Sequence, residues 1–315
     1  MRCACLIQDG RRPRYRPPNV LLTKREVARN IVTETPFYFL RGDTRLFGML
    51  HAPGSLATAR HAYVMSHPFG EEKLWSHRVF VVFARALADR GIPVLRFDYR
   101  GAGDSGGDTA SASVDEYLDD LGAAIEALAT RVPAATRVGL IGLRLGATLA
   151  AQFVERARLT QTFPLVQGAP LALWDPILDG ESYIQELLRI NLSTQLAVYG
   201  KVQESREVLV ERIRGGGIAN VEGYEIGLPL FASASLKELL PAEGLRHAGG
   251  TLVVQVAATD KAKLREDQQH FAELCTDATF QRAIEQPFWR EIKAFCSRAE
   301  NLQNQTLQWL ELRHG

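Results

Sequence analysis

Cysteine is scarce in this sequence, which has four among its 315 residues. Cys3 and Cys5 lie near the N-terminus, and Cys275 and Cys296 lie near the C-terminus. Their spacing matches neither a zinc site nor the dense pairing of a small disulfide-stabilised domain. We therefore expect no bound metal, and we expect no cofactor.

Long apolar runs and an excess of one charge are also absent. No stretch approaches the roughly 18 consecutive apolar residues of a membrane helix, and the first 30 residues lack the apolar segment of a secretory signal peptide. Lys and Arg number 37 against 36 Asp and Glu, so a net charge of +1 lacks the basic excess typical of nucleic-acid-binding proteins. We expect a cytoplasmic protein with no membrane span and no specific nucleic-acid partner.

The hydrophobic content of 46% is enough for a large folded core. The first 30 residues are the exception, because they carry eight Lys or Arg against Asp9 and Glu26, with three prolines interspersed. A segment this polar cannot bury enough apolar surface to order itself. We expect residues 1–33 to form a flexible basic extension, either inert or in weak contact with nucleic acid or with the rest of the chain.

From residue 37 onward the hydrophobic pattern alternates between strands and helices. A hairpin is predicted over residues 37–50, around the turn sequence Arg41-Gly42-Asp43-Thr44. Strand-like apolar runs follow at 62–66, 92–97, 138–141, 163–166, 251–256 and 278–284. Helical periodicity separates them at 74–90, 114–130, 147–158 and 264–274, and a last helix ends near residue 312. The pattern predicts a doubly wound, mostly parallel α/β sheet with an N-terminal antiparallel hairpin.

Between residues 175 and 250 the strand pattern stops. Two helical stretches at 183–188 and 202–213 take its place. We interpret 175–250 as a helical cap inserted into a core formed by 34–174 and 251–315. Such an insertion would cover the carboxyl ends of the strands, where open α/β sheets bind ligands.

Four short motifs follow predicted strands. They are Ser66-His67-Pro68-Phe69-Gly70, Asp98-Tyr99-Arg100-Gly101-Ala102-Gly103-Asp104-Ser105, Gly142-Leu143-Arg144-Leu145-Gly146 and Thr259-Asp260. In this order they resemble the α/β-hydrolase fold. The stretches HPFGEEKLWSHR, FDYRGAGDS, GLRLGA and LWDPILDGESYIQELLR are most similar to the serine-aminopeptidase-like group, particularly the hydrolases associated with exosortase systems. The resemblance covers residues 36–312 and implies hydrolysis of an ester, thioester or amide.

The resemblance places Arg144 where the family has its nucleophile. In the Gly-x-Ser-x-Gly elbow a serine attacks the substrate carbonyl, whereas a guanidinium keeps its proton near neutral pH and has no lone pair for this attack. Gly142 and Gly146 keep the small residues that the sharp turn needs. Because an elbow lies at the floor of a pocket, we expect Arg144 to bind an anion, with an arbitrary surface residue as the alternative.

The other triad positions of the family are matched only in part. Asp260 fits the position of the acid that orients the histidine. The histidine should follow the last strand, but residues 285–290 read EQPFWR. We therefore expect an incomplete triad, in which Asp260 or Glu71 could pair with Arg144. His67 is the candidate base, acting on a bound water, or else a structural residue.

The resemblance also implies two backbone amides that stabilise an oxyanion, and these fall on Leu145 and Phe69. The N-terminal end of the elbow helix is positive as well. Together with Arg144, these groups would form a receptor for a carboxylate, a phosphate or a thioester oxygen. We expect Trp174 and Asp175 at the rim of the pocket, with a packing role as the alternative.

Two functions follow from these residues. The first is a hydrolase or acyl transferase with a non-standard site centred on Arg144. The alternative is a catalytically inactive pseudo-hydrolase that binds an acyl or anionic small molecule or a partner protein. The sequence leaves the substrate and the oligomeric state open.

Overall fold

The computed structural model describes residues 32–290 and 298–314. The predicted N-terminal extension therefore lies outside the described residues, apart from its last two. In the part of the chain that is described, no helix is long and apolar enough to cross a membrane.

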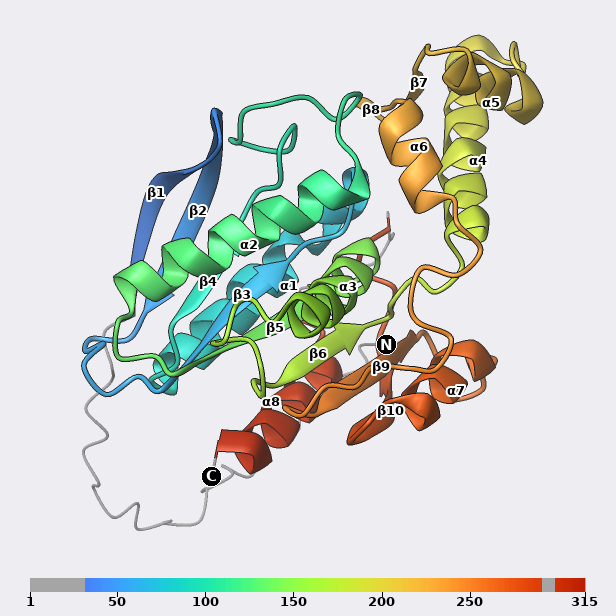
Figure 1. The fold of residues 1–315 in the computed structure, drawn as a ribbon. Helices are drawn as coiled ribbons and strands as arrows, with labels where there is room; N and C mark the ends of the chain where they lie inside the picture. The colour runs from blue at the N-terminus through green and yellow to red at the C-terminus, as the bar shows by residue number, and fades with distance from the viewer. Residues whose placement is uncertain (1–31, 291–297, 315) are drawn as a thin grey trace, which may run out of the picture.

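One eight-stranded sheet forms the centre of the protein (Figure 1), with the strand order β1-β2-β4-β3-β5-β6-β9-β10. The strands are β1 (Thr33–Arg41), β2 (Thr44–Ala52), β3 (His61–Ser66), β4 (Val94–Phe97), β5 (Arg137–Leu143), β6 (Leu171–Trp174), β9 (Thr251–Ala257) and β10 (Ala278–Ile284). β1 and β2 form an antiparallel hairpin, β2 is antiparallel to β4, and the remaining neighbours are parallel. The predicted mostly parallel sheet with an N-terminal hairpin is confirmed.

Helices cover both faces of this sheet. They are α1 (Glu71–Asp89) and α8 (Glu300–His314) on one face, and α2 (Val114–Arg131), α3 (Leu145–Thr160) and α7 (Glu266–Leu274) on the other. Successive strand side chains point to opposite faces, so Tyr63 and Met65 pack with α1, whereas Val64 packs with α2. The start of α2 is fixed by a capping box, in which Ser113 and Glu116 bond each other's backbone amides.

The parallel register gathers the predicted motifs at one edge of the sheet. Ser66 at the end of β3 lies opposite Gly142 of β5, and Leu143 lies opposite Trp174 of β6. The loops after β3, β5 and β6 therefore leave the sheet side by side, at the carboxyl ends where ligands bind in open α/β sheets.

The strand predicted at residues 163–166 is wrong. This segment is a series of turns, and Phe163 has a positive φ of 51° that a strand does not accommodate. Pro164 follows it and cannot donate a strand hydrogen bond. The sheet uses the fully buried β6 instead, eight residues after Phe163.

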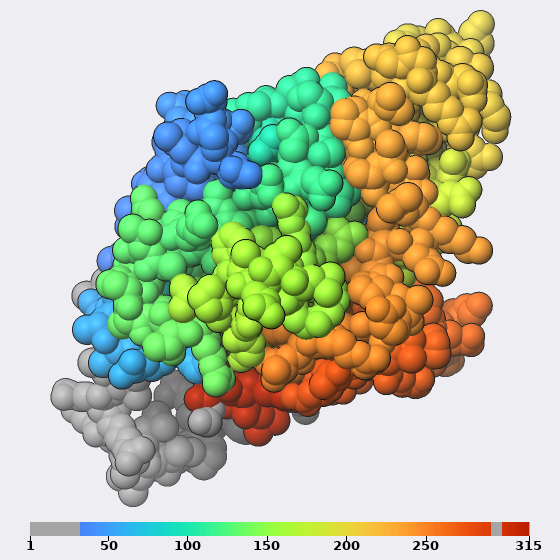
Figure 2. Space-filling model, in the orientation of Figure 1, coloured from blue at the N-terminus to red at the C-terminus, as the bar shows by residue number. Residues whose placement is uncertain are grey.

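A largely helical segment lies between β6 and β9. It contains α4 (Gly180–Tyr199), α5 (Arg206–Arg214), the two-stranded β7 (Ala219–Val221) and β8 (Tyr224–Ile226), and α6 (Leu228–Ala234). The short β7–β8 hairpin was not predicted. Figure 1 shows α4, α5 and α6 beyond the carboxyl end of β6, and the same yellow and orange segment forms one end of the molecule in Figure 2. We call residues 175–250 the insertion.

Candidate functional site

The elbow between β5 and α3 keeps the backbone geometry of a sharp strand-to-helix turn. Arg144 has φ 54° and ψ −123°, in a region that residues other than glycine rarely adopt. A Cβ at Gly146 would collide with the carbonyl oxygens of Ser66 and His67, and one at Gly142 would lie 2.5 Å from the Cα of Ala147. Gly146 is therefore required by the close approach of the elbow to the loop after β3, and Gly142 by the sharp turn from β5 into α3.

The Arg144 side chain is 4% exposed and faces three carboxylates of its own chain. Its Nε donates to Glu72 Oε1 at 3.0 Å, and its Nη2 donates to Glu186 Oε2 at 3.0 Å. Its Nη1 donates to Asp175 Oδ2 at 3.4 Å. These partners come from α1, from α4 of the insertion and from the end of β6, so one guanidinium connects three parts of the chain. We call Arg144, Glu72, Asp175 and Glu186 the arginine cluster.

Further groups complete the contacts of the arginine cluster. The hydroxyl of Tyr183 donates to Glu72 at 3.1 Å, and Gln268 Nε2 donates to Asp175 at 3.3 Å. Arg290, after β10, pairs with the second oxygen of Glu186. The rings of Tyr183 and Trp289 lie 5.5 and 5.4 Å from the guanidinium carbon of Arg144, within cation–π range.

The pKa directions agree with this geometry. Burial alone would lower the pKa of Arg144, but the charges of Glu72, Asp175 and Glu186 raise it above its ordinary value. Burial raises the pKa of Glu72, against the opposing charge of Arg144. Arg144 is therefore a permanent cation inside the protein, with its charge offset by its own chain.

The partners of Arg144 differ from those that the sequence predicts. Asp260 is exposed, and its backbone oxygen accepts a hydrogen bond from Arg282 at 3.4 Å. Glu71 opens α1, but its neighbour Glu72 is the residue that turns toward the elbow. The expected pairing of Arg144 with Asp260 or Glu71 is wrong. We expected the guanidinium nitrogens to face an external anion. In the structure they face carboxylates of the same chain.

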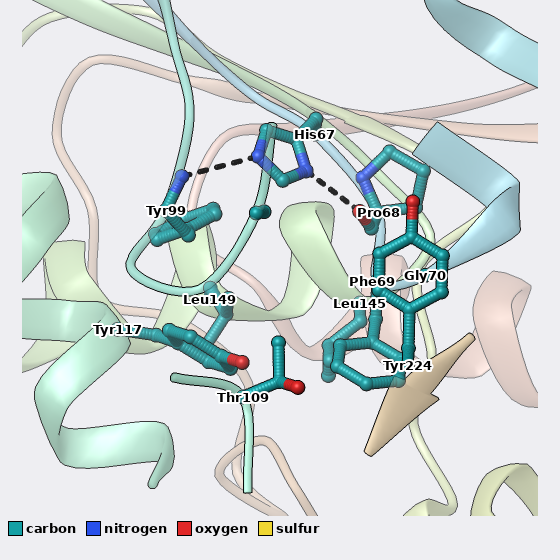
Figure 3. A pocket seen from close by; sticks show the side chains of 11 residues that line it. His67, Pro68, Phe69, Gly70, Tyr99, Thr109, Tyr117, Leu145, Leu149 and Tyr224 are labelled. Atoms are coloured by element: carbon teal, nitrogen blue, oxygen red, sulfur yellow. Dashed lines mark hydrogen bonds between the residues drawn. The ribbon is translucent and has the colours of Figure 1, made fainter. Parts of the chain in front are cut away.

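His67 is held by the backbone at both ring nitrogens. Its Nδ1 donates to the carbonyl oxygen of Pro68 at 2.6 Å, and its Nε2 accepts from the amide of Tyr99 at 3.3 Å (Figure 3). Because a carbonyl only accepts and an amide only donates, this pattern fixes the neutral tautomer. Burial, together with the charge of Lys73, lowers the pKa of His67 to about 4. The geometry supports the structural alternative for this histidine over the candidate base.

The two residues at the oxyanion positions line one cavity. Phe69 and Leu145 lie there with Leu149, Tyr99, Tyr117 and Tyr224 (Figure 3). The cavity measures about 20 Å³, which is room for about one water molecule. Its walls are mainly apolar, and Figure 3 shows the rings of Tyr117 and Tyr224 on opposite sides of it. The cavity that Phe69 and Leu145 line is thus too small for a substrate of ordinary size.

Trp174 and Asp175, expected at the pocket rim, have separate roles. Trp174 is fully buried between sheet and helices, where its ring packs edge-on against Phe83 and its Nε1 donates to Thr306 at 3.0 Å. The rim expectation for Trp174 is wrong, and the packing alternative describes it. Asp175 is buried in the arginine cluster, with a positive φ of 46°.

Sequence reasoning missed Glu72, Tyr183, Glu186 and Arg290. Tyr183 and Glu186 are three residues apart on α4, so they share one helix face, and this spacing was the available signal. Within residues 32–290 and 298–314, no group of three or more His, Cys, Asp or Glu side chains could hold a metal ion.

Comparisons with known proteins agree on the fold. The family model described as serine aminopeptidase, S33 matches residues 58–212. The ferulic acid complex of Est1E from Butyrivibrio proteoclasticus is 14% identical and has a TM-score of 0.61, with 88% of this chain and 98% of that chain covered. A structure from Agrobacterium vitis S4 is 15% identical with a TM-score of 0.56, covering 90% of this chain and 98% of that chain.

The Pyrococcus furiosus esterase Pf2001 is 17% identical to this chain, with a TM-score of 0.54 and coverage of 90% and 92%. At these identities the likeness establishes the fold and not the chemistry. A comparison with curated proteins found no match.

Proposed function

We propose that this protein, which has the α/β-hydrolase fold, binds a ligand without cleaving it. The arginine cluster carries this proposal. Arg144 holds the position from which the superfamily's serine attacks, and its guanidinium donates to three carboxylates. A cation with its donors engaged in this way cannot act as a nucleophile.

The remaining triad positions support the same proposal. Asp260 is exposed at the surface, and residues 285–297, where the histidine would follow the last strand, contain none. His67 is neutral and bonded to the backbone at both nitrogens. Neither the triad positions nor His67 therefore supplies a general base beside the elbow in the described part of the chain.

A second candidate is the hydrolase or acyl transferase with a site centred on Arg144. The observation that favours it is that Phe69 and Leu145 line the same cavity, since an oxyanion site would be formed by the backbone amides of these two residues facing one space. A water molecule bound there would be the attacking group, and Glu72 would be the buried carboxyl nearest to the elbow side chain.

Turnover distinguishes the two candidates. Purified protein is incubated with p-nitrophenyl acetate, butyrate and octanoate and with acetyl-coenzyme A, beside Arg144→Ala and Glu72→Gln variants shown to be folded by circular dichroism. The proposed function expects product formation at the rate of buffer alone in every sample. Saturable turnover that disappears in Arg144→Ala or Glu72→Gln would establish the hydrolase instead.

A fluorophosphonate probe gives an independent reading, because it labels activated serine nucleophiles wherever they lie in the chain. We expect no labelling of the native protein. Labelling at any serine would overturn the proposal by identifying a nucleophile outside the elbow.

A further inference from the structure

Glu186 connects the insertion to the core through both of its carboxylate oxygens. One oxygen accepts from Arg144 of the elbow at 3.0 Å, and the other pairs with Arg290, after β10. The Glu186 side chain is 31% exposed, whereas that of Arg144 is 4% exposed. A single partly exposed carboxylate of α4 therefore bridges two cations of the core.

This contact can break without leaving a bare charge in the interior. Without Glu186, the Nε and Nη1 of Arg144 still face Glu72 and Asp175. Arg290 has a side chain that is 55% exposed, so water solvates it when its partner leaves. Breaking a buried ion pair is costly mainly when the remaining charge is uncompensated. The Glu186 contact thus meets the electrostatic condition for a reversible contact, and opening also separates Tyr183 of α4 from Glu72.

The insertion supplies one wall of the cavity beside the elbow. Tyr224 of β8 lies over Phe69, with ring centroids 6.0 Å apart, while the opposite wall and floor come from the core (Figure 3). The amide of Glu225 donates to Thr109 at 3.2 Å, which holds the hairpin on the cavity. Movement of the insertion away from the core would therefore enlarge this space.

The lining indicates what an enlarged cavity would accept. The walls are mainly aromatic and aliphatic, and Tyr99, Thr109, Tyr117 and Tyr224 bring hydroxyl groups to them. The Tyr99 hydroxyl pairs with Ser66, and Thr109 accepts from the amide of Glu225. Tyr117 is 3% exposed, and its phenol oxygen points into the space in Figure 3. A phenol hydroxyl can donate one hydrogen bond, so a ligand with an acceptor would pair with this one.

We propose that Glu186 is a latch that holds the insertion closed over this cavity, and that the opened pocket takes a small apolar ligand with one hydrogen-bond acceptor for Tyr117. This inference rests on the proposed function, because a protein that binds without cleaving needs a pocket that opens. The arginine at the elbow then has a definite role, which is to provide the core side of the latch.

Hydrogen–deuterium exchange tests the latch. In Glu186→Ala we expect amides of α4 and of the β7–β8 hairpin to exchange at least tenfold faster, while β3 in the sheet keeps its native rate. Glu204→Ala is the matched control, because Glu204 also pairs with an arginine, Arg212, but within the insertion. We expect Glu204→Ala to leave the exchange of α4 and the hairpin unchanged.

Arg290→Gln provides a second variant, since Arg290 is exposed and its replacement does not threaten folding. It should accelerate exchange of the same segments, by less than Glu186→Ala does. Native exchange rates in both variants, or equal acceleration in Glu204→Ala, would overturn the latch.

Ligand binding tests the pocket. Acetophenone and ethylbenzene have similar size, but only the ketone offers an acceptor. In Glu186→Ala we expect acetophenone to bind at least fivefold more tightly than ethylbenzene by ligand-observed NMR, and Glu186→Ala/Tyr117→Phe to lose this preference. Equal affinities in Glu186→Ala, or a preference that survives Tyr117→Phe, would overturn the assignment of the ligand class.

These results are separable from the proposed function. Turnover of an ester by the native protein would contradict non-cleaving binding and leave the latch intact. Unchanged exchange in Glu186→Ala, with no turnover, would remove the latch and leave the proposed function standing.

Discussion

Arg144→Ala is expected to lower the free energy of unfolding by about 3 kcal/mol at pH 7. The substitution removes the cation that faces Glu72 and Asp175, whose side chains are 10% and 6% exposed. Glu186 keeps Arg290, and Asp175 keeps Gln268. The variant therefore leaves about one buried carboxylate uncompensated, and not three. This places the expected loss of unfolding free energy at the lower end of the roughly 3–5 kcal/mol for a broken buried pair.

The loss is expected to be smaller at pH 5 than at pH 7. Burial already raises the pKa of Glu72 above its ordinary 4.5, against the opposing charge of Arg144. Removing Arg144 raises the pKa of Glu72 further. A carboxyl with a raised folded-state pKa costs stability only as the pH rises through that pKa, because below it the buried group is neutral.

Urea unfolding followed by circular dichroism at pH 5 and pH 7 measures both effects. Arg212→Ala is the control, because it removes an exposed arginine from an ion pair with Glu204, and such pairs contribute less than about 1 kcal/mol. A loss in Arg144→Ala below about 1 kcal/mol at pH 7, or an equal loss at the two pH values, would refute the reasoning.

Acidification should destabilise the native protein through His67, whose folded-state pKa is about 4 against an ordinary 6.5. This depressed pKa contributes roughly 3 kcal/mol to the free energy of unfolding above pH 6.5, and the contribution is lost as the pH falls toward 4. In His67→Gln the free energy of unfolding, measured with urea, should therefore depend less on pH. Gly146→Ala should cost about 2 kcal/mol or more by thermal unfolding, since its Cβ would meet backbone atoms, whereas Gly106→Ala, with no atom closer than 3.4 Å, should cost little. Arg100→Ala should cost roughly 3 kcal/mol by leaving the fully buried Asp120 without its cation, and a native melting temperature would contradict this.

The sheet and the elbow could be predicted because their signals are local. The strand β10 was predicted with its correct bounds, residues 278–284. The elbow was located by Gly142 and Gly146, two residues on either side of Arg144. Both glycines are required by backbone approaches that the structure confirms. Such signals depend on spacing within a few residues, which a single sequence contains.

The partners of Arg144 could not be predicted because they are distant in sequence. Glu72 and Glu186 lie 72 and 42 residues away. The choice of Glu72 over Glu71 depends on where α1 begins, since adjacent helical residues point about 100° apart. Motif matching to a catalytic family also directed attention to Asp260, although β9 ends in a loop that leaves this side chain exposed.

Local apolarity misled the interpretation in two places. Residues 163–166 are apolar enough for a strand, but the positive φ of Phe163 turns the chain there. Trp174 is the last residue of β6, and the loops after the adjacent strands approach the site. The Trp174 ring nevertheless points to the face of the sheet that α1 and α8 cover. In both cases the deciding quantity is a backbone direction that periodicity alone does not specify.

The measurement that tests the central claim most directly is the rate of p-nitrophenyl butyrate hydrolysis by the native protein and by Arg144→Ala at matched concentration. If Arg144 closes the elbow as an internally paired cation, both proteins release p-nitrophenol at the rate of buffer alone. Saturable release by the native protein that is abolished in the folded Arg144→Ala variant would contradict the account, because it would make Arg144 part of a working active site.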